Sequence, residues 1–261
     1  MDAIAEKRRF KEAMIGMGVA FMILVFFSSR AWAIRPLSTD DAGTVEKGKF
    51  QIETGFDISR EDNHDREIAP LITFSYGLLD NIDVGVGISY IFYRPKKGDN
   101  EDGLDDTELK LKYRILDEKE GLPAFALSAT MKFPTASEKK GLGSGKADLG
   151  FNTILTKNLS KRWVVHVNLG YTLMGEHGAD NEFNYSAAVQ FVLSDRWCLV
   201  GEIGGVNNFN GHKRDDPFSG LLGAYYLFRN DIVWDVGVEI GMNRAAPDFR
   251  LTTGFTLLFT P

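Results

Sequence analysis

The sequence predicts an all-β protein: a transmembrane antiparallel up-and-down β-barrel of about 12 strands, preceded by a cleavable signal peptide. Three observations predict this class. The N-terminus carries an export signal, segments of about ten residues alternate apolar with polar side chains, and the connections between them are alternately long and short. Segments of this length can cross a bilayer at a tilt, whereas strands of soluble proteins usually have about five or six residues.

Residues 1–33 have the three parts of a secretory signal peptide. Basic residues at positions 7–11 precede an apolar run over 15–27, and Ala-Trp-Ala at 31–33 supplies the small residues of a cleavage site. The run is shorter than the roughly 20 residues of a membrane-spanning helix, and no later segment is long and apolar enough to form one. The expected parts are a signal peptide over 1–33, a periplasmic N-terminal segment over 34–49 that could enter the barrel as a partial plug, and the barrel over 50–261.

Six segments show the alternation most clearly. In 107–115 the odd positions are uncharged, and the even positions are Glu108, Lys110, Lys112 and Arg114. All charged side chains of the six segments lie on one face, and the opposite face holds none. A soluble β-sandwich also has one apolar face, so strand and connection lengths must decide between the two classes. The six segments are 50–58, 81–93, 107–115, 163–173, 232–242 and 249–259.

Six weaker segments bring the expected number of strands to about 12. Long polar connections alternate with mostly short ones, which is the loop pattern of an outer-membrane barrel. The connection 116–122 is long for the short side, and Pro70 weakens the second strand because proline lacks the backbone N–H. The weaker segments are 68–77, 123–133, 147–156, 183–193, 197–206 and 218–228. The long connections are 59–67, 94–106, 134–146, 174–182, 207–217 and 243–248.

Aromatic side chains gather at both ends of the expected strands. With an even number of strands both termini lie in the periplasm, so each aromatic residue can be assigned a height, and two girdles result. The last strand ends in Phe259, a position typical of the signal that the barrel-assembly machinery recognises. The expected periplasmic girdle is Phe50, Tyr76, Tyr113, Phe125, Trp163, Trp197, Trp234 and Phe259, and the outer one is Tyr90, Phe92, Tyr171 and Tyr185.

The polar faces line the lumen of the predicted barrel, and their charges are candidate selectivity residues. In a plugged barrel such charges pair because unpaired burial is costly, whereas in a narrow pore they act on a permeating solute. Both interpretations stay open, although inward glycines remove volume and slightly favour a pore. The candidates are Lys110, Lys112, Arg114, Lys132, Arg162, Arg250, Glu53, Asp83, Glu202, Asp235 and Glu239. The inward glycines are Gly55, Gly85, Gly87, Gly150, Gly170, Gly204, Gly237, Gly241 and Gly254.

Two stretches of the chain resemble a known family. They are residues 35–61, beginning R-P-L-S-T-D-D-A-G-T, and residues 132–157, containing K-F-P-T-A-S-E-K-K-G-L-G-S-G. Both are similar to the family of outer-membrane barrels associated with the meta-cleavage pathway of phenol degradation, whose members are often labelled as transporters. The resemblance implies an exported barrel that takes up small solutes, aromatic compounds among them, and it supplies no catalytic residues.

Other classes of function find little support in the sequence. The net charge of −6 at pH 7 does not indicate a nucleic-acid partner. The single cysteine, Cys198, excludes an intrachain disulfide, and no metal-ligand spacing, cofactor motif or catalytic motif stands out. We therefore expect a non-enzymatic protein of the cell outer membrane, surrounded by lipid, that acts as a passive channel or uptake protein for small solutes. A barrel hydrolase and a non-conducting structural barrel are the alternatives.

Overall fold

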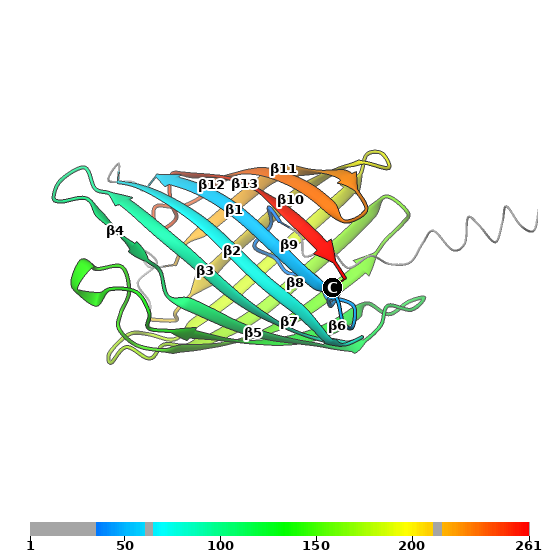
Figure 1. The fold of residues 1–261 in the computed structure, drawn as a ribbon, viewed down its shortest axis with the longest axis horizontal. Coiled ribbons are helices and arrows are strands. Elements are labelled where there is room, and N and C mark those ends of the chain that lie inside the picture. Colours follow the sequence, from blue (N-terminus) through cyan, green and yellow to red (C-terminus); the bar gives the residue numbers. More distant parts are fainter. Residues whose placement is uncertain (1–34, 61–64, 211–215, 261) are drawn as a thin grey trace, which may run out of the picture. The chain divides into compact units, whose positions relative to one another are not determined.

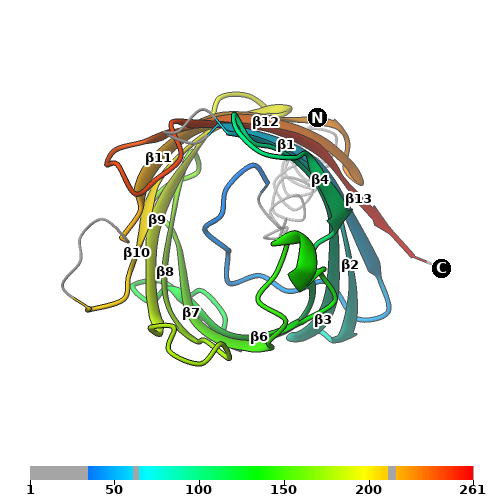
Figure 2. The ribbon, with the colours of Figure 1, turned by 90° about the vertical axis from the view of Figure 1, so that its left-hand side faces the viewer.

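A closed ring of long β-strands forms most of the chain that the computed structural model describes, residues 35–60, 65–210 and 216–260 (Figures 1 and 2). Every strand is antiparallel to its neighbours, so the predicted fold class is confirmed, and the expected signal peptide lies outside the described residues. The strands of the ring are β1 (Phe50–Arg60), β2 (Arg66–Leu79), β3 (Ile82–Arg94), β5 (Thr107–Leu116), β6 (Ala124–Phe133), β7 (Asp148–Asn158), β8 (Trp163–Leu173), β9 (Glu182–Val192), β10 (Trp197–Asn207), β11 (Phe218–Arg229), β12 (Ile232–Gly241) and β13 (Phe249–Phe259).

The ring closes where the first and last strands meet. β1 pairs with β13 along its whole length, from Phe50 opposite Phe259 to Arg60 opposite Phe249, and it pairs with β2 on its other side. A sheet without free edges leaves no row of unpaired backbone N–H and C=O groups, which is the condition for a sheet in membrane hydrocarbon. The strands run obliquely across the barrel, as closure of a sheet requires (Figure 1).

One short strand lies where the sequence predicts a loop over 94–106. This strand, β4 (Glu101–Leu104), is hydrogen-bonded to β3. β3 pairs with β5 only over residues 82–87, so the edge of β3 beyond that point is available, and β4 pairs with residues 90–93 of that edge. The extra strand therefore exists because β3 is longer than the part of its edge that β5 covers.

The predicted loop over 134–146 contains a short 3-10 helix, η1 (Glu138–Lys140). The helix ends at Gly141, whose φ of 69° lies in the left-handed region that glycine adopts without strain. No helix among the described residues is long and apolar enough to cross a membrane.

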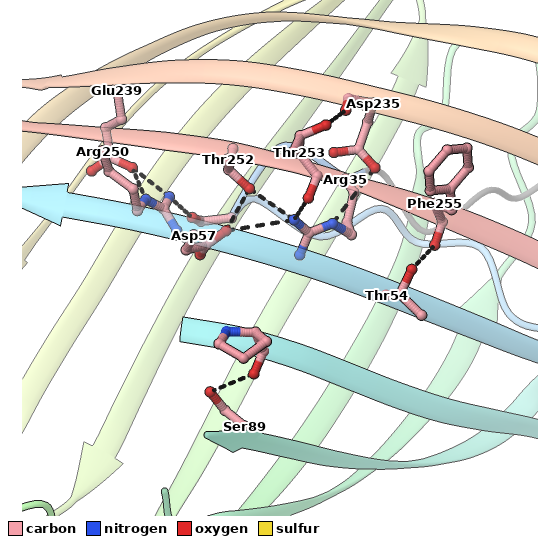
Figure 3. A network of polar contacts seen from close by, with 12 residues as sticks. Arg35, Thr54, Asp57, Ser89, Asp235, Glu239, Arg250, Thr252, Thr253 and Phe255 are labelled. Atoms are coloured by element: carbon pink, nitrogen blue, oxygen red, sulfur yellow. Dashed lines mark hydrogen bonds and ion pairs between the residues drawn. The ribbon is translucent and has the colours of Figure 1, made fainter. Parts of the chain in front are cut away.

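Pro70 interrupts the sheet on one side only. β2 pairs with β1 through Pro70, which lies opposite Phe56, but its pairing with β3 omits Ala69 and Pro70. The Ser89 hydroxyl of β3 donates a hydrogen bond to the Pro70 carbonyl at 3.3 Å and spans this interruption (Figure 3). The missing proline N–H thus weakens β2 locally, as predicted, without breaking the strand.

Neighbouring side chains along each strand have opposite environments. Leu111 and Leu222 are 48% and 76% exposed, whereas Lys112 and Asp235 are 6% and 1% exposed. The apolar side chains therefore cover the outside of the ring, and the charged side chains lie inside it. This distribution is the reverse of a soluble protein and is that of a barrel whose outer surface contacts lipid tails.

Aromatic rings pair at both ends of the barrel. We call the end with the short β2–β3, β9–β10 and β11–β12 turns the short-turn end and the opposite one the long-loop end. Pairs at the short-turn end are Phe50–Tyr76, Phe50–Phe259, Trp163–Phe191 and Trp197–Tyr226. Pairs at the long-loop end are Tyr90–Phe92, Phe183–Tyr185 and Tyr185–Phe218. These rings match the two aromatic girdles of a membrane barrel, whose short turns face the periplasm.

Candidate functional site in the barrel lumen

The chain that precedes β1 lies inside the ring. Figure 2 looks along the barrel and shows this part of the chain, in blue, within the circle of strands. Thr39, Asp41, Ala42 and Thr44 are each at most 5% exposed. We call residues 35–45 the inserted segment. Residues 35–45 thus lie in the lumen, as the partial plug that the sequence allowed would do.

Arg35 anchors the start of the inserted segment to the seam of the barrel (Figure 3). Its Nη2 donates to Thr252 Oγ1 at 2.7 Å and lies 3.6 Å from Asp57 Oδ1, and its Nε lies 3.6 Å from Asp235 Oδ2. These three partners belong to β13, β1 and β12, so one guanidinium group links the strands that close the ring. Burial of the charge of Arg35 is compensated by two carboxylates.

A second arginine extends this network (Figure 3). Arg250 of β13 bonds to Glu239 of β12, and its Nη1 lies 3.2 Å from Asp57 Oδ2. Its Nη2 also donates to the Ser38 hydroxyl at 3.2 Å. The charges of β12 and β13 are therefore paired with each other and also hold the inserted segment.

Glycines on the inward face make room for the inserted segment. A Cβ atom at Gly55 or Gly254 would overlap the Arg35 side chain, and one at Gly223 would lie 2.8 Å from Pro36. The inward glycines Gly55 and Gly254 therefore do not widen an open pore. They form the space in which Arg35 lies.

Two lysines of β5 hold the middle of the segment. Lys112 Nζ lies 3.1 Å from Asp40 Oδ1 and donates to the Asp41 carbonyl at 3.3 Å, while Lys110 bonds to the other Asp40 oxygen. Burial alone raises the pKa of Asp40, but the two ammonium groups outweigh it and hold that pKa well below its usual range. Asp40 is therefore ionised and forms a charge pair with both lysines.

Side chains of β7, β8 and β10 bind the backbone of the segment. The Thr39 N–H donates to Glu202 Oε2 at 2.7 Å, and the Ala42 N–H donates to Thr156 Oγ1 at 2.9 Å. Asn168 makes two bonds to Asp40: its Oδ1 accepts the N–H at 2.8 Å and its Nδ2 donates to the carbonyl at 2.9 Å. The buried backbone of the segment thus finds partners on several strands, as a buried chain requires.

The remaining candidate residues are distributed along the barrel. Lys132 bonds to Asp148 and lies 3.4 Å from Asp106 Oδ2. Arg114 donates to the Asp80 carbonyl at 2.9 Å near the short-turn end. Asp83 accepts the Val45 N–H at 2.9 Å, Glu53 is half-buried on β1, and Arg162 is exposed in the turn before β8. The structure therefore brings Lys110, Lys112, Asp83, Glu202, Asp235 and Arg250 onto the inserted segment.

A cavity lies beside the inserted segment in the long-loop half of the lumen. Its volume is about 640 Å³, and we call it the vestibule. Its lining includes Ser38 of the inserted segment and residues 246–247 of the β12–β13 connection. The described residues that line the vestibule include carboxylates, amides and hydroxyls but no lysine or arginine. The described residues also contain no group of three or more histidine, cysteine, aspartate or glutamate side chains that could hold a metal ion.

The inserted segment should respond to pH through Asp41, which faces Lys112, Asp40 and Lys110. Burial raises the pKa of Asp41 to about 7. The docked segment therefore keeps a proton on Asp41 that a released segment would lose, so the contribution of Asp41 to docking is lost as pH rises from its ordinary pKa of 3.8 to about 7. We expect channel openings in planar bilayers to become more frequent as pH rises toward about 7 and to level off above it. The variant Asp41→Asn should remove this dependence, and an equally steep dependence in that variant would contradict the assignment to Asp41.

The comparison with known protein families decides the identity of the chain. Residues 33–259 match the family described as “Putative MetA-pathway of phenol degradation”. The chain belongs to this family. The match includes the inserted segment and the whole barrel, in agreement with the resemblance seen in the sequence. None of the curated proteins matches the chain significantly.

Solved structures similar to this family member are barrels of outer membranes. An outer-membrane channel from Pseudomonas putida F1 has a TM-score of 0.63 at 14% identity, over 85% of this chain and 100% of that one. The NanC porin has a TM-score of 0.56 at 11% identity, over 80% and 98%. The KdgM porin, solved with disordered oligogalacturonate, has 0.56 at 8% identity, over 80% and 99%. These likenesses establish the fold, and barrels with this apolar belt and loop pattern belong to outer membranes.

Proposed function

We propose that the protein is a passive channel that takes up small solutes across the outer membrane. The polar lumen is the observation that carries the proposal. It holds a short chain segment, bound by hydrogen bonds and ion pairs, and beside it a vestibule of about 640 Å³. In a narrow barrel the inward side chains alone fill the interior, which leaves room neither for a separate chain segment nor for a cavity of this size.

The family suggests small aromatic compounds as solutes, and the lumen charges suggest how solutes are sorted. The inserted segment is bound by Lys110, Lys112, Arg250 and Glu202, and in the proposed channel a permeating molecule would pass these charges. Opposed charges at a constriction act on the charge of a solute. We propose that these residues, together with the other lumen charges, set the selectivity of the channel.

An enzymatic role is less well supported by the lumen. A hydrolase needs a nucleophile and a base within hydrogen-bond reach and open to substrate. His166 Nδ1 lies 2.9 Å from Thr156 Oγ1, but that hydroxyl also accepts the Ala42 N–H, and His166 is only 2% exposed. The inserted segment therefore covers this pair, and we propose that the protein is not an enzyme.

Liposome swelling tests the channel directly. Purified protein in liposomes should admit small solutes from a panel of sugars, amino acids and small aromatics, at rates that fall with solute size. Protein-free liposomes and liposomes with heat-unfolded protein are the controls. Swelling no faster than in these controls for every solute would favour the non-conducting structural barrel, and lipase activity of the purified barrel would favour the hydrolase.

The charge pair between Asp40 and the two lysines predicts opposite shifts in ion selectivity. Asp40→Asn removes the negative partner and leaves the charges of Lys110 and Lys112 unpaired. The reversal potential should therefore shift toward the equilibrium potential of the anion. The double variant Lys110→Gln and Lys112→Gln should shift it toward cations. Arg229→Gln, at an exposed arginine beside the β11–β12 turn and outside the lumen, is the matched charge-removing control. Identical reversal potentials for the two lumen variants in planar bilayers would contradict a conducting path past Asp40.

A further inference from the structure

The vestibule has the chemistry of a site for uncharged, hydroxyl-rich molecules. Three asparagines, Asn152, Asn168 and Asn184, project into it from the neighbouring strands β7, β8 and β9, and Thr130 and Ser219 add hydroxyl groups. Amide and hydroxyl groups both donate and accept hydrogen bonds, as the hydroxyls of a polyol do. The volume falls in the range of small-ligand sites, roughly 300–1,000 Å³.

Two of the three asparagines, Asn152 and Asn184, keep an amide oxygen available, whereas Asn168 is bonded to Asp40 and Asn152. Asn152 Nδ2 donates to Asn168 Oδ1 at 3.1 Å, and Asn184 Nδ2 donates to Thr172 Oγ1 at 3.0 Å. These bonds fix the two amide planes. The Oδ1 atoms of Asn152 and Asn184 have no partner among the described residues, so two oriented acceptors line the vestibule.

The charges of the lining disfavour anionic ligands. The lining contains Glu108, Glu202 and Glu239 and, within the described chain, no cationic side chain. Glu239 is paired with Arg250 and Glu202 accepts the Thr39 N–H, so these carboxylates are already partly satisfied. An anionic solute would meet acceptors and like charge without a cation to bind it, which is costly.

Apolar solutes are also disfavoured. The two aromatic residues at the border, Phe151 and Tyr185, alternate with the inward Asn152 and Asn184 and so belong to the outer face. Phe151 is accordingly 50% exposed on the outside. An aromatic hydrocarbon in the vestibule would therefore cover amide oxygens without offering hydrogen bonds to them.

We infer that the vestibule is a binding site for neutral polyhydroxylated solutes of the size of a mono- or disaccharide, which it holds before they pass the inserted segment. This inference rests on the proposed channel function and names the solute class that the vestibule, as distinct from the rest of the channel, would bind. The asparagine acceptors supply the recognition, and the described lining, which has no cationic group, disfavours anionic sugars.

Isothermal titration calorimetry with maltose tests the site without requiring conduction. The full-length barrel is used in a detergent without a sugar headgroup, with galacturonate and phenol as the anionic and aromatic probes. We expect maltose to bind more tightly than either probe. The double variant Asn152→Leu and Asn184→Leu should weaken maltose binding about tenfold or more, because two oriented hydrogen bonds are lost. Gln190→Leu, in the lumen but outside the vestibule, is the matched control and should bind as the wild type does.

A second variant guards against a double mutant that does not fold. A Cβ atom at Gly150 would meet nothing nearer than Thr172 Oγ1 at 3.5 Å, so Gly150→Phe fits the backbone and fills the vestibule. It should abolish maltose binding with both asparagines intact. Maltose binding that is absent in the wild type, or unchanged in both folded variants, overturns the inference. Liposome swelling without maltose binding would contradict the binding site and leave the channel function supported. Maltose binding without liposome swelling would contradict the channel function and leave the binding site supported.

Discussion

Deletion of residues 35–45 is expected to raise the single-channel conductance several-fold. The deleted residues lie within the lumen and are bound there from several sides by Asp57, Lys112, Glu202 and Asn168. Removing them widens the path for ions, since the ring itself closes through β1 and β13 and does not use them. Planar-bilayer recordings of the wild type and the deletion variant measure the change.

A variant of full length separates release of the segment from loss of chain. A leucine at Gly55 would occupy the space of the Arg35 guanidinium, so Gly55→Leu should displace the start of the segment and also raise conductance. Heat-modifiable mobility on gels confirms that each variant still forms a barrel. Conductance equal to that of the wild type in both folded variants would show that the inserted segment does not obstruct the lumen.

Leu222→Arg is expected to destabilise the barrel by about 2–4 kcal/mol, the cost of an arginine near the middle of the bilayer. Leu222 is the most exposed apolar side chain of β11 and lies near the middle of this strand. The free energy of unfolding is measured by urea titration of the protein in phosphatidylcholine vesicles. Leu222→Ala is the control and should cost much less, because alanine keeps an apolar surface toward the lipid. An arginine variant as stable as the alanine variant would place Leu222 outside the hydrocarbon.

The strands and their faces could be predicted because they depend on local pattern. In 107–115 the lysines and the leucines occupy opposite parities, and one face of this strand must contact lipid. That argument places Lys110 and Lys112 in the lumen and Leu111 outside, as the structure has them. The same pattern gives no information on β4, which exists because part of the β3 edge is free.

The contacts of the inserted segment could not be predicted from pattern. Residues 35–45 have no periodicity, and Asp40 meets Lys110 and Lys112 across about 70 residues of chain. Only the path of the segment through the lumen brings them together. Gly55 and Gly254 likewise suggest open space in the sequence, although the structure fills that space with Arg35.

Quenching of a fluorescent label by brominated lipid measures most directly which side chains touch the membrane. Leu221 and Leu222 are adjacent on β11 but are 2% and 76% exposed. A cysteine replaces one or the other in a background in which the buried Cys198 is changed to serine. A label at 222 should be strongly quenched and a label at 221 only weakly. Strong quenching at 221 with little at 222 would mean that the face assigned to the lumen contacts the lipid. That result would contradict the lipid-facing surface on which the channel depends.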